Sequence, residues 1–79
     1  MTVAEVTQSI DARGMACPGP LMALIGAIRQ AQVGDVIEVL SSDEGSKTDI
    51  PAWLNKAGHE LIEVVPEDGY SRFMIRKVR

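Results

Sequence analysis

The 79-residue sequence has one cysteine, one histidine and one each of tryptophan, tyrosine and phenylalanine. A single cysteine excludes a disulfide within the chain and any zinc or iron–sulfur site built from several thiolates. A free thiol fits a reducing compartment, so we expect the protein to be cytoplasmic. Because the sequence lacks a long apolar run and the N-terminal pattern of an export signal, we expect no membrane anchor.

Basic residues are also few, with 8 Lys and Arg against 11 Asp and Glu and a net charge of −3. This balance gives no bulk attraction to phosphate backbones or anionic lipids, which counts against nucleic acid and membranes as partners. Hydrophobic residues make up 46% and charged residues 24%, as in an average soluble domain. We therefore predict one globular domain over residues 1–79, too small for a deep active-site cavity.

The first half of the chain predicts strand, helix and strand. Residues 3–10 are rich in β-branched side chains and predict a strand. Leu21, Leu24 and Ile28 recur at helical spacing and predict a helix that opens at Cys17-Pro18 and continues to about Gln32. Residues 35–41 are dense in β-formers and predict a second, central strand.

The second half predicts a helix followed by a hairpin. Both Ser46, in a capping box with Asp49, and Thr48 are candidate N-caps, and Pro51 favours the later start. Gly58 supplies a left-handed C-cap to this helix. Strands are predicted at 60–65 and 70–78, on either side of a turn that contains an Asp-Gly pair.

The order is therefore βαβαββ, an α+β fold in which two helices cover one face of a four-stranded mixed sheet as a two-layer α/β sandwich. We expect Phe73 and Ile75 to point toward the helices. The other sheet face stays open and is expected to carry four residues of the last strand. These are Tyr70, Arg72, Met74 and Arg76.

The most informative motif is Cys17-Pro18-Gly19-Pro20. Because Pro18 is tolerated at the first helical position, Cys17 is predicted as the N-cap. The helix dipole and the Gly19 N–H would then stabilise a thiolate, and we expect a lowered Cys17 pKa. Pro20 removes a competing donor, and Gly19 leaves the sulfur open to a partner.

Two residues of the preceding loop are further candidates. Arg13 could add a positive charge beside the sulfur or bind a carboxylate of a partner, and Gly14 would bend the loop. The alternative interpretation is structural. In that case Cys17 is a small buried residue and the prolines only mark the start of a helix.

The absence of a second cysteine limits what a reactive Cys17 can do. A dithiol redox cycle is excluded, because no resolving thiol exists in the chain. One exposed thiolate can take a sulfane sulfur from a donor, hold it as a persulfide and pass it to an acceptor thiolate, with no metal or other cofactor. Peroxide reduction would need an external thiol, and metal delivery would need more ligands than lie nearby in the sequence.

With these residues in place, the chain resembles the TusA/SirA/YedF family of sulfur carrier proteins along nearly its whole length. The cysteine motif with its preceding Asp-x-Arg-Gly loop is specific, and the later matches add weight by their order and spacing. The matching positions are IDARGMACPGPL at 10–21, Ser42-Asp43, DIPAW at 49–53, GHEL at 58–61 and Arg76-Lys77.

The resemblance implies a fold like the C-terminal domain of bacterial initiation factor three. It implies that Cys17 bears the persulfide, while Arg13, Gly14, Pro18 and Pro20 shape the site and its docking surface. It also implies a rhodanese or cysteine desulfurase as sulfur donor and a DsrE-type protein as acceptor. Transfer-RNA thiolation, molybdenum-cofactor assembly and dissimilatory sulfur oxidation are the pathways it allows, and the protein would be a carrier loaded stoichiometrically rather than a turnover enzyme.

The chain departs from the family on the outer face of its first helix. Many relatives carry lysines there, whereas this sequence has Met22, Ala23, Gly26 and Ala27 and no charge before Arg29. Such an apolar strip is either an ordinary helix surface or a docking or self-association face.

A second function class uses the open sheet face instead of the thiol. Arg72, Arg76, Lys77 and Arg79 make the last strand basic and suggest a regulatory module that binds RNA or protein, although the net charge and the lack of interleaved aromatic residues argue against RNA. His59 has no second histidine to join and is interpreted as structural. Trp53 lies at helical spacing with apolar neighbours and is assigned to the core.

Overall fold

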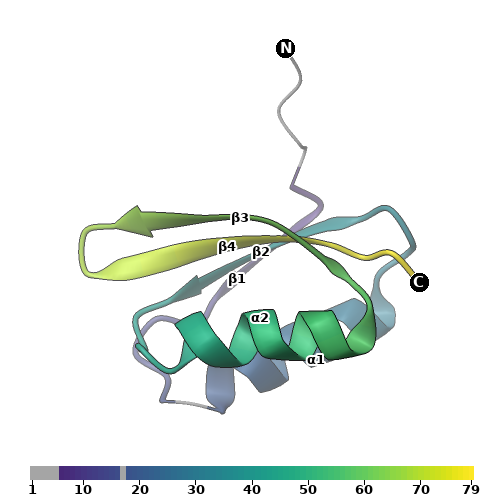
Figure 1. The fold of residues 1–79 in the computed structure, drawn as a ribbon. Helices are drawn as coiled ribbons and strands as arrows, with labels where there is room; N and C mark the ends of the chain where they lie inside the picture. The colour runs from purple at the N-terminus through teal and green to yellow at the C-terminus, as the bar shows by residue number, and fades with distance from the viewer. Residues whose placement is uncertain (1–5, 17) are drawn as a thin grey trace.

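The computed structural model describes residues 6–16 and 18–79 and folds into two layers (Figure 1). One layer is a sheet of four strands and the other is a pair of helices that both lie against the same face of that sheet. The elements are β1 (Gln8–Asp11), α1 (Gly19–Gln30), β2 (Val36–Ser41), α2 (Ser46–Ala57), β3 (Glu60–Glu67) and β4 (Tyr70–Arg76). The predicted βαβαββ sandwich is confirmed.

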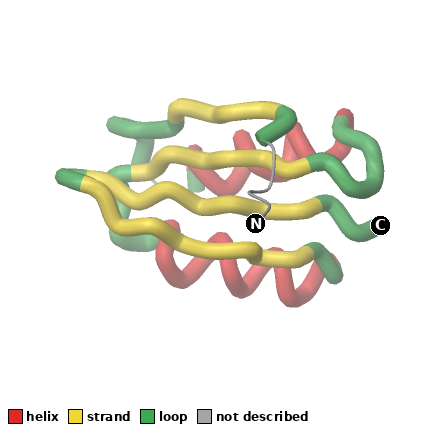
Figure 2. The backbone as a smooth tube through the Cα atoms, turned by 90° about the horizontal axis from the view of Figure 1, so that it is seen from above, coloured by secondary structure: helices red, strands yellow, loops and turns green. Residues whose placement is uncertain are grey.

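The strands lie in the order β1-β2-β4-β3, as seen from the open side in Figure 2. β1 runs parallel to β2, and β4 is antiparallel to both β2 and β3. The sheet is therefore mixed, and β2 is central as predicted. β1 and β3 are the edge strands.

The core lies between the sheet and the helices. Phe73 and Ile75 of β4 are fully buried, so the predicted inward face of this strand is confirmed. They pack with Leu24 of α1 and Ile50 and Leu54 of α2. Burial of such side chains is worth about 1.5 to 3 kcal/mol each and outweighs local preferences that oppose it.

That burial explains why α2 begins earlier than predicted. The helix starts at Ser46 with Gly45 as its N-cap, and Pro51 lies inside it. Thr48 is not the N-cap, because its N–H already donates to the Gly45 carbonyl at 3.1 Å. Ser46 forms no capping box either, since its hydroxyl is buried and bonded to the Ser41 hydroxyl at 2.8 Å.

The two hairpin strands also differ from their predicted bounds. β3 continues through Pro66 to Glu67, which an edge strand allows because it needs no ladder bond on its outer side. β4 ends at Arg76, two residues early. β1 is seen from Gln8 onward, and the first three residues of its predicted range lie outside the described residues.

The open sheet face is crossed by ion pairs. Arg72 contacts both Glu38 and Glu67, at 3.2 and 2.6 Å, and Arg76 contacts Glu60 at 3.4 Å. Met74 lies on this face, as the alternation along β4 predicts, but its side chain is only 8% exposed. In the register of the sheet it lies between Glu38 and Glu63, on strands that flank β4 on both sides.

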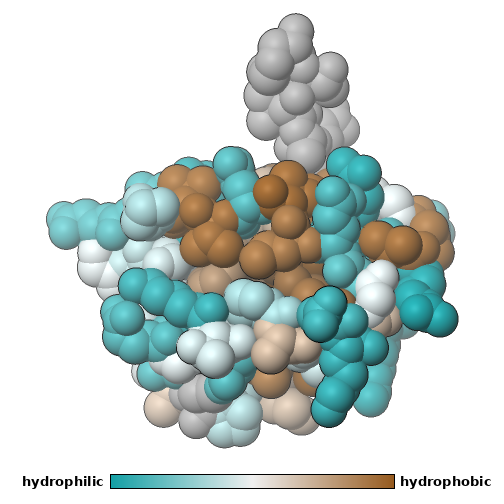
Figure 3. Space-filling view, in the orientation of Figure 1, coloured by the Kyte–Doolittle hydropathy of each residue, from teal (hydrophilic) through white to brown (hydrophobic). Residues whose placement is uncertain are grey.

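Figure 3 views the molecule from the side of α2 and β3. Apolar side chains gather at the level of the sheet, whereas polar side chains dominate over the helix layer. Val64 of the β3 edge is 39% exposed. The polar covering agrees with an amphipathic α2 that buries Ile50 and Leu54 on its other face.

Candidate functional site

The site predicted from the sequence centres on Cys17, which lies outside the described residues. The loop before it and the helix after it are described. This loop runs from the end of β1 at Asp11 to Ala16, and α1 begins at Gly19.

Three backbone N–H groups fix this loop, one by a bond to the sheet, one by a bond to the residue after β2 and one by a bond within the loop. Ala12 is fully buried, and its N–H donates to the Leu40 carbonyl of β2 at 2.8 Å. The Gly14 N–H donates to the Ser42 hydroxyl at 2.9 Å, and the Met15 N–H donates to the Ala12 carbonyl at 3.2 Å. Gly14 has φ of +86°, so the chain turns at this glycine as expected.

Arg13 already has a carboxylate partner within the chain. Its Nε and Nη2 atoms donate to the two oxygens of Asp11 at 2.9 Å each, and its backbone N–H donates to Asp11 Oδ1 at 3.2 Å. These hydrogen bonds lower the pKa of Asp11 to about 2 and raise that of Arg13. The guanidinium carbon also lies 4.9 Å from the centre of the Tyr70 ring. Sequence reasoning missed both partners.

The start of α1 differs from the prediction. Pro18, not Cys17, is the N-cap, and it makes no side-chain capping hydrogen bond. The Gly19 N–H donates to the Ala16 carbonyl at 2.8 Å. The predicted contact of this N–H with the cysteine sulfur lies outside the described residues. Pro18 and Pro20 have no backbone N–H, so the Gly19 N–H is the one donor between them. It closes a turn with Ala16 before the helix begins.

Gly19 and Pro20 have packing roles that the sequence did not indicate. A Cβ atom on Gly19 would lie 3.2 Å from Cβ of Met15, so the glycine makes room for that side chain. Pro20 is fully buried beneath the helix start. The loop and the helix are therefore packed tightly on each side of the cysteine position.

The apolar strip on α1 is narrower than expected. Met22 is 59% exposed and Gly26 is exposed, but Ala27 is buried in the core, so its predicted place on the strip is wrong. Met15 of the loop is also exposed, by 45%. Met15 and Met22 are thus the large apolar side chains that this loop and the first turn of α1 expose.

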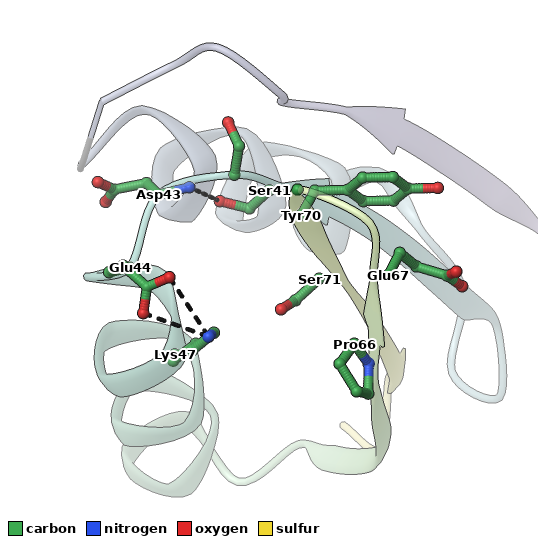
Figure 4. Close-up of a pocket in the computed structure, with 10 residues that line it drawn as sticks. Ser41, Asp43, Glu44, Lys47, Pro66, Glu67, Tyr70 and Ser71 are labelled. Atoms are coloured by element: carbon green, nitrogen blue, oxygen red, sulfur yellow. Dashed lines mark hydrogen bonds and ion pairs between the residues drawn. The ribbon is translucent and has the colours of Figure 1, made fainter.

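A polar hollow of about 220 Å³ opens beside the cysteine loop (Figure 4). One wall is the loop between β2 and α2, and the opposite wall is the β3–β4 hairpin. Ser42 and Tyr70 line it and also contact Gly14 and Arg13, so the cysteine loop and the hollow share a wall. The sequence predicts only polar turns at these residues, so the hollow between them was not predicted.

Within residues 6–16 and 18–79, no three His, Asp or Glu side chains come together in a way that could hold a metal ion. Neither helix in this described part has the length and apolar character that crossing a membrane requires. His59 has a structural partner, because its Nδ1 accepts the Val78 N–H at 3.1 Å. Trp53 packs at the edge of the core and against the His59 ring.

Comparison with known proteins gives one consistent result. The family model described as sulfurtransferase TusA matches residues 8–77. A protein of Archaeoglobus fulgidus, named as a candidate sulfur carrier, is 56% identical over 70 residues, which cover 89% of this chain and 96% of that protein. Sulfur carrier protein TusA of Pseudomonas aeruginosa is 37% identical over 73 residues, covering 92% of each chain.

A solved structure has the same fold. The SirA-like protein from Desulfitobacterium hafniense superposes with a TM-score of 0.81, covering 92% of this chain and all of that one, at 24% identity. This likeness confirms the predicted architecture.

Proposed function

This chain belongs to the TusA family of sulfur carrier proteins, and we propose that it is a single carrier domain that holds its sulfur as a persulfide on Cys17. The observation that carries the proposal is that the family match runs through residues 8–77 and includes the one cysteine of the chain. A carrier with one thiol has one place to hold a sulfane sulfur.

The proposed relay is a pair of thiolate exchanges that need no oxidant or reductant. The Cys17 thiolate attacks the outer sulfur of a donor persulfide, forming a sulfur–sulfur bond to Cys17 and releasing the donor thiolate. An acceptor thiolate then attacks the outer sulfur on Cys17, takes it as a new persulfide and leaves the Cys17 thiolate free. The sulfane sulfur keeps its oxidation state throughout.

The residues around Cys17 support this chemistry by fixing the loop and leaving one side open. Ala12 ties the loop to β2 and Gly14 ties it to Ser42 just beyond that strand, and Pro18 and Pro20 stand at the start of α1. Gly19 admits Met15 beneath the turn, and Met22 offers exposed apolar surface for a partner. Arg13 is proposed as a loop-shaping residue through its bond to Asp11.

The partners proposed for the relay are proteins. A rhodanese or cysteine desulfurase would supply the sulfur, and a DsrE-type protein would accept it. The acceptor would lead to transfer-RNA thiolation, molybdenum-cofactor assembly or sulfur oxidation, and we propose the cytoplasm as the place where this happens.

The competing function, RNA or protein binding through the open sheet face, finds little support. Arg72 is shared between two carboxylates and Arg76 is paired with Glu60, so both arginines on this face already have acidic partners. A phosphate backbone would have to displace these carboxylates, which the net charge of −3 does not favour.

Intact-mass measurement tests the proposed function. After incubation with polysulfide, or with thiosulfate and a rhodanese, the wild-type protein should gain about 32 Da per sulfur, and a reductant should remove it. Cys17→Ser should fold normally and gain nothing. A gain that persists in Cys17→Ser, or no gain on a folded wild-type protein, would contradict the proposal.

A further inference from the structure

Two segments that lie far from the cysteine in the sequence contact adjacent residues of its loop. Ser42, just after β2, accepts the Gly14 N–H at its hydroxyl, with 2.9 Å between the two atoms. Tyr70, the first residue of β4, has its ring centre 4.9 Å from the guanidinium carbon of Arg13. Both residues line the hollow shown in Figure 4. The β2–α2 loop and the β3–β4 hairpin therefore each reach the cysteine loop.

The Ser42 contact fixes the loop at the point where it turns. Gly14 has φ of +86°, and its N–H takes part in neither a helix nor the sheet. A backbone N–H in such a position needs an acceptor from elsewhere, and the Ser42 hydroxyl supplies it. Both residues are exposed, so water can replace the hydroxyl and a variant without it should still fold.

The Tyr70 contact acts on an arginine that is already oriented. Both oxygens of Asp11, the last residue of β1, accept from the Arg13 guanidinium at 2.9 Å. The ring of Tyr70 lies within the distance of a cation–π contact, which extends to about 6 Å. This cluster of three side chains joins the end of β1 and the start of the cysteine loop to the hairpin.

The next residues carry this fixed position toward the cysteine. Two residues after Gly14, the Ala16 carbonyl accepts the Gly19 N–H at 2.8 Å, at the first residue of α1. The chain just before Cys17 is therefore held to the sheet on one side and to the helix start on the other. The stabilisation that a helix N-terminus gives to a thiolate falls off within the first turn, so it depends on how this segment is held.

We propose that Ser42 and Tyr70 are positioning residues for the sulfur transfer at Cys17, Ser42 through Gly14 and Tyr70 through Arg13. Neither touches the reacting sulfur in this scheme. Each holds the loop so that the thiolate stays at the start of α1. The inference rests on the proposed function, because it assigns further residues to the same reaction.

The test is the exchange of the thiol with the aromatic disulfide dithiobis(nitrobenzoate), followed against pH. The Cys17 thiolate attacks one sulfur of this probe, forms a mixed disulfide and releases one coloured thionitrobenzoate, so the reaction is the same type of exchange as the relay. Ser42→Ala and Tyr70→Leu should each raise the midpoint of the pH profile. The fall in the ionisation constant should be about fivefold, as loss of one ordinary hydrogen bond would give.

Conservative variants separate positioning from general damage to the fold. Ser42→Thr keeps the hydroxyl and Tyr70→Phe keeps the ring, so both should retain the wild-type midpoint. Because Tyr70 acts through Arg13, Tyr70→Leu should add nothing to the rise that Arg13→Met causes by itself. Additive rises in the double variant would overturn the assigned route.

Thr7→Val is the matched control. The Thr7 hydroxyl also accepts a backbone N–H, from Val36 at 3.2 Å, but at the opposite end of β2 from Ser42. This variant should keep the wild-type midpoint. A wild-type midpoint in Ser42→Ala or Tyr70→Leu, or an equal rise in Thr7→Val, would overturn the proposal. Failure of the carrier function would appear instead as missing persulfide mass on the wild-type protein, whatever the midpoint of its exchange.

Discussion

At the scale of single residues, His59 shows how a side chain without a catalytic role can still report on the fold. Its Nδ1 accepts the Val78 N–H, so the folded state needs this nitrogen unprotonated. Burial lowers its pKa below the ordinary value, and the positive charges of Lys77 and Arg79 lower it further. Its ring also packs 5.8 Å from the ring of Trp53.

The pH dependence of stability follows from this lowered pKa. The unfolded chain binds the proton more readily than the folded protein, so the contribution of His59 to stability is complete above about pH 6.5 and declines as the pH falls through its folded-state pKa. Urea unfolding should give a lower free energy at pH 5.5 than at pH 7.5. Asp11 has a pKa of about 2 against an ordinary 3.8, so its contribution to the free energy of unfolding changes only at pH values below 5.5.

His59→Gln is the control for that prediction, because glutamine retains an acceptor and does not titrate. As His59 is the one histidine of the chain, the variant should lose most of the difference between pH 5.5 and 7.5. An unchanged difference in the variant, or a wild-type protein more stable at pH 5.5, would show that His59 is not the responsible group.

At the scale of elements, the end of α1 depends on a residue that lies far away in the sequence. Lys77, just beyond β4, donates from Nζ to the carbonyls of Ile28 and Ala31, each at 2.7 Å. The Ile28 carbonyl also accepts the N–H of Ala31, the C-cap residue, at 3.2 Å. A cation at this end of the helix interacts favourably with the helix dipole. Local sequence patterns placed the helix end near Gln32, whereas it ends at Gln30.

Removing this cap should destabilise the fold. Lys77→Met keeps the aliphatic stem but loses both hydrogen bonds, and we expect unfolding free energy to fall by about 1 to 2 kcal/mol. Chemical denaturation measures the change. Lys56→Met, on an exposed position in the last turn of α2, should cost less than about 0.5 kcal/mol. Equal losses in the two variants would mean that the contacts of Lys77 contribute nothing specific.

At the scale of the whole molecule, periodicity and turn residues were enough to predict the order of elements, the mixed sheet and the single helix-covered face. Alternation along β4 placed Phe73 and Ile75 in the core, and Gly58 marked the end of α2 with φ of +85°. Those features depend on neighbours within a few residues. Pro51 misled the prediction because burial of Ile50 and Leu54 decides where α2 forms.

The surroundings of the cysteine were harder to predict, since they depend on contacts between distant segments. Cys17-Pro18-Gly19-Pro20 identified the place of interest, but the contact of Arg13 with Tyr70 requires the loop to fold back on the sheet. The hollow likewise forms only when the β3–β4 hairpin meets the β2–α2 loop. No local sequence pattern predicts either of these long-range contacts.

The most direct test of the relay is to follow a labelled outer sulfur from the protein to a thiol. Wild-type protein loaded with ³⁴S-polysulfide and freed of excess reagent is mixed with a peptide that contains one cysteine, and both intact masses are measured. The account predicts that the protein loses about 34 Da and the peptide gains the same mass as a persulfide. A mixed disulfide between Cys17 and the peptide, with the label released as sulfide, would contradict it, because the acceptor would then have attacked the wrong sulfur.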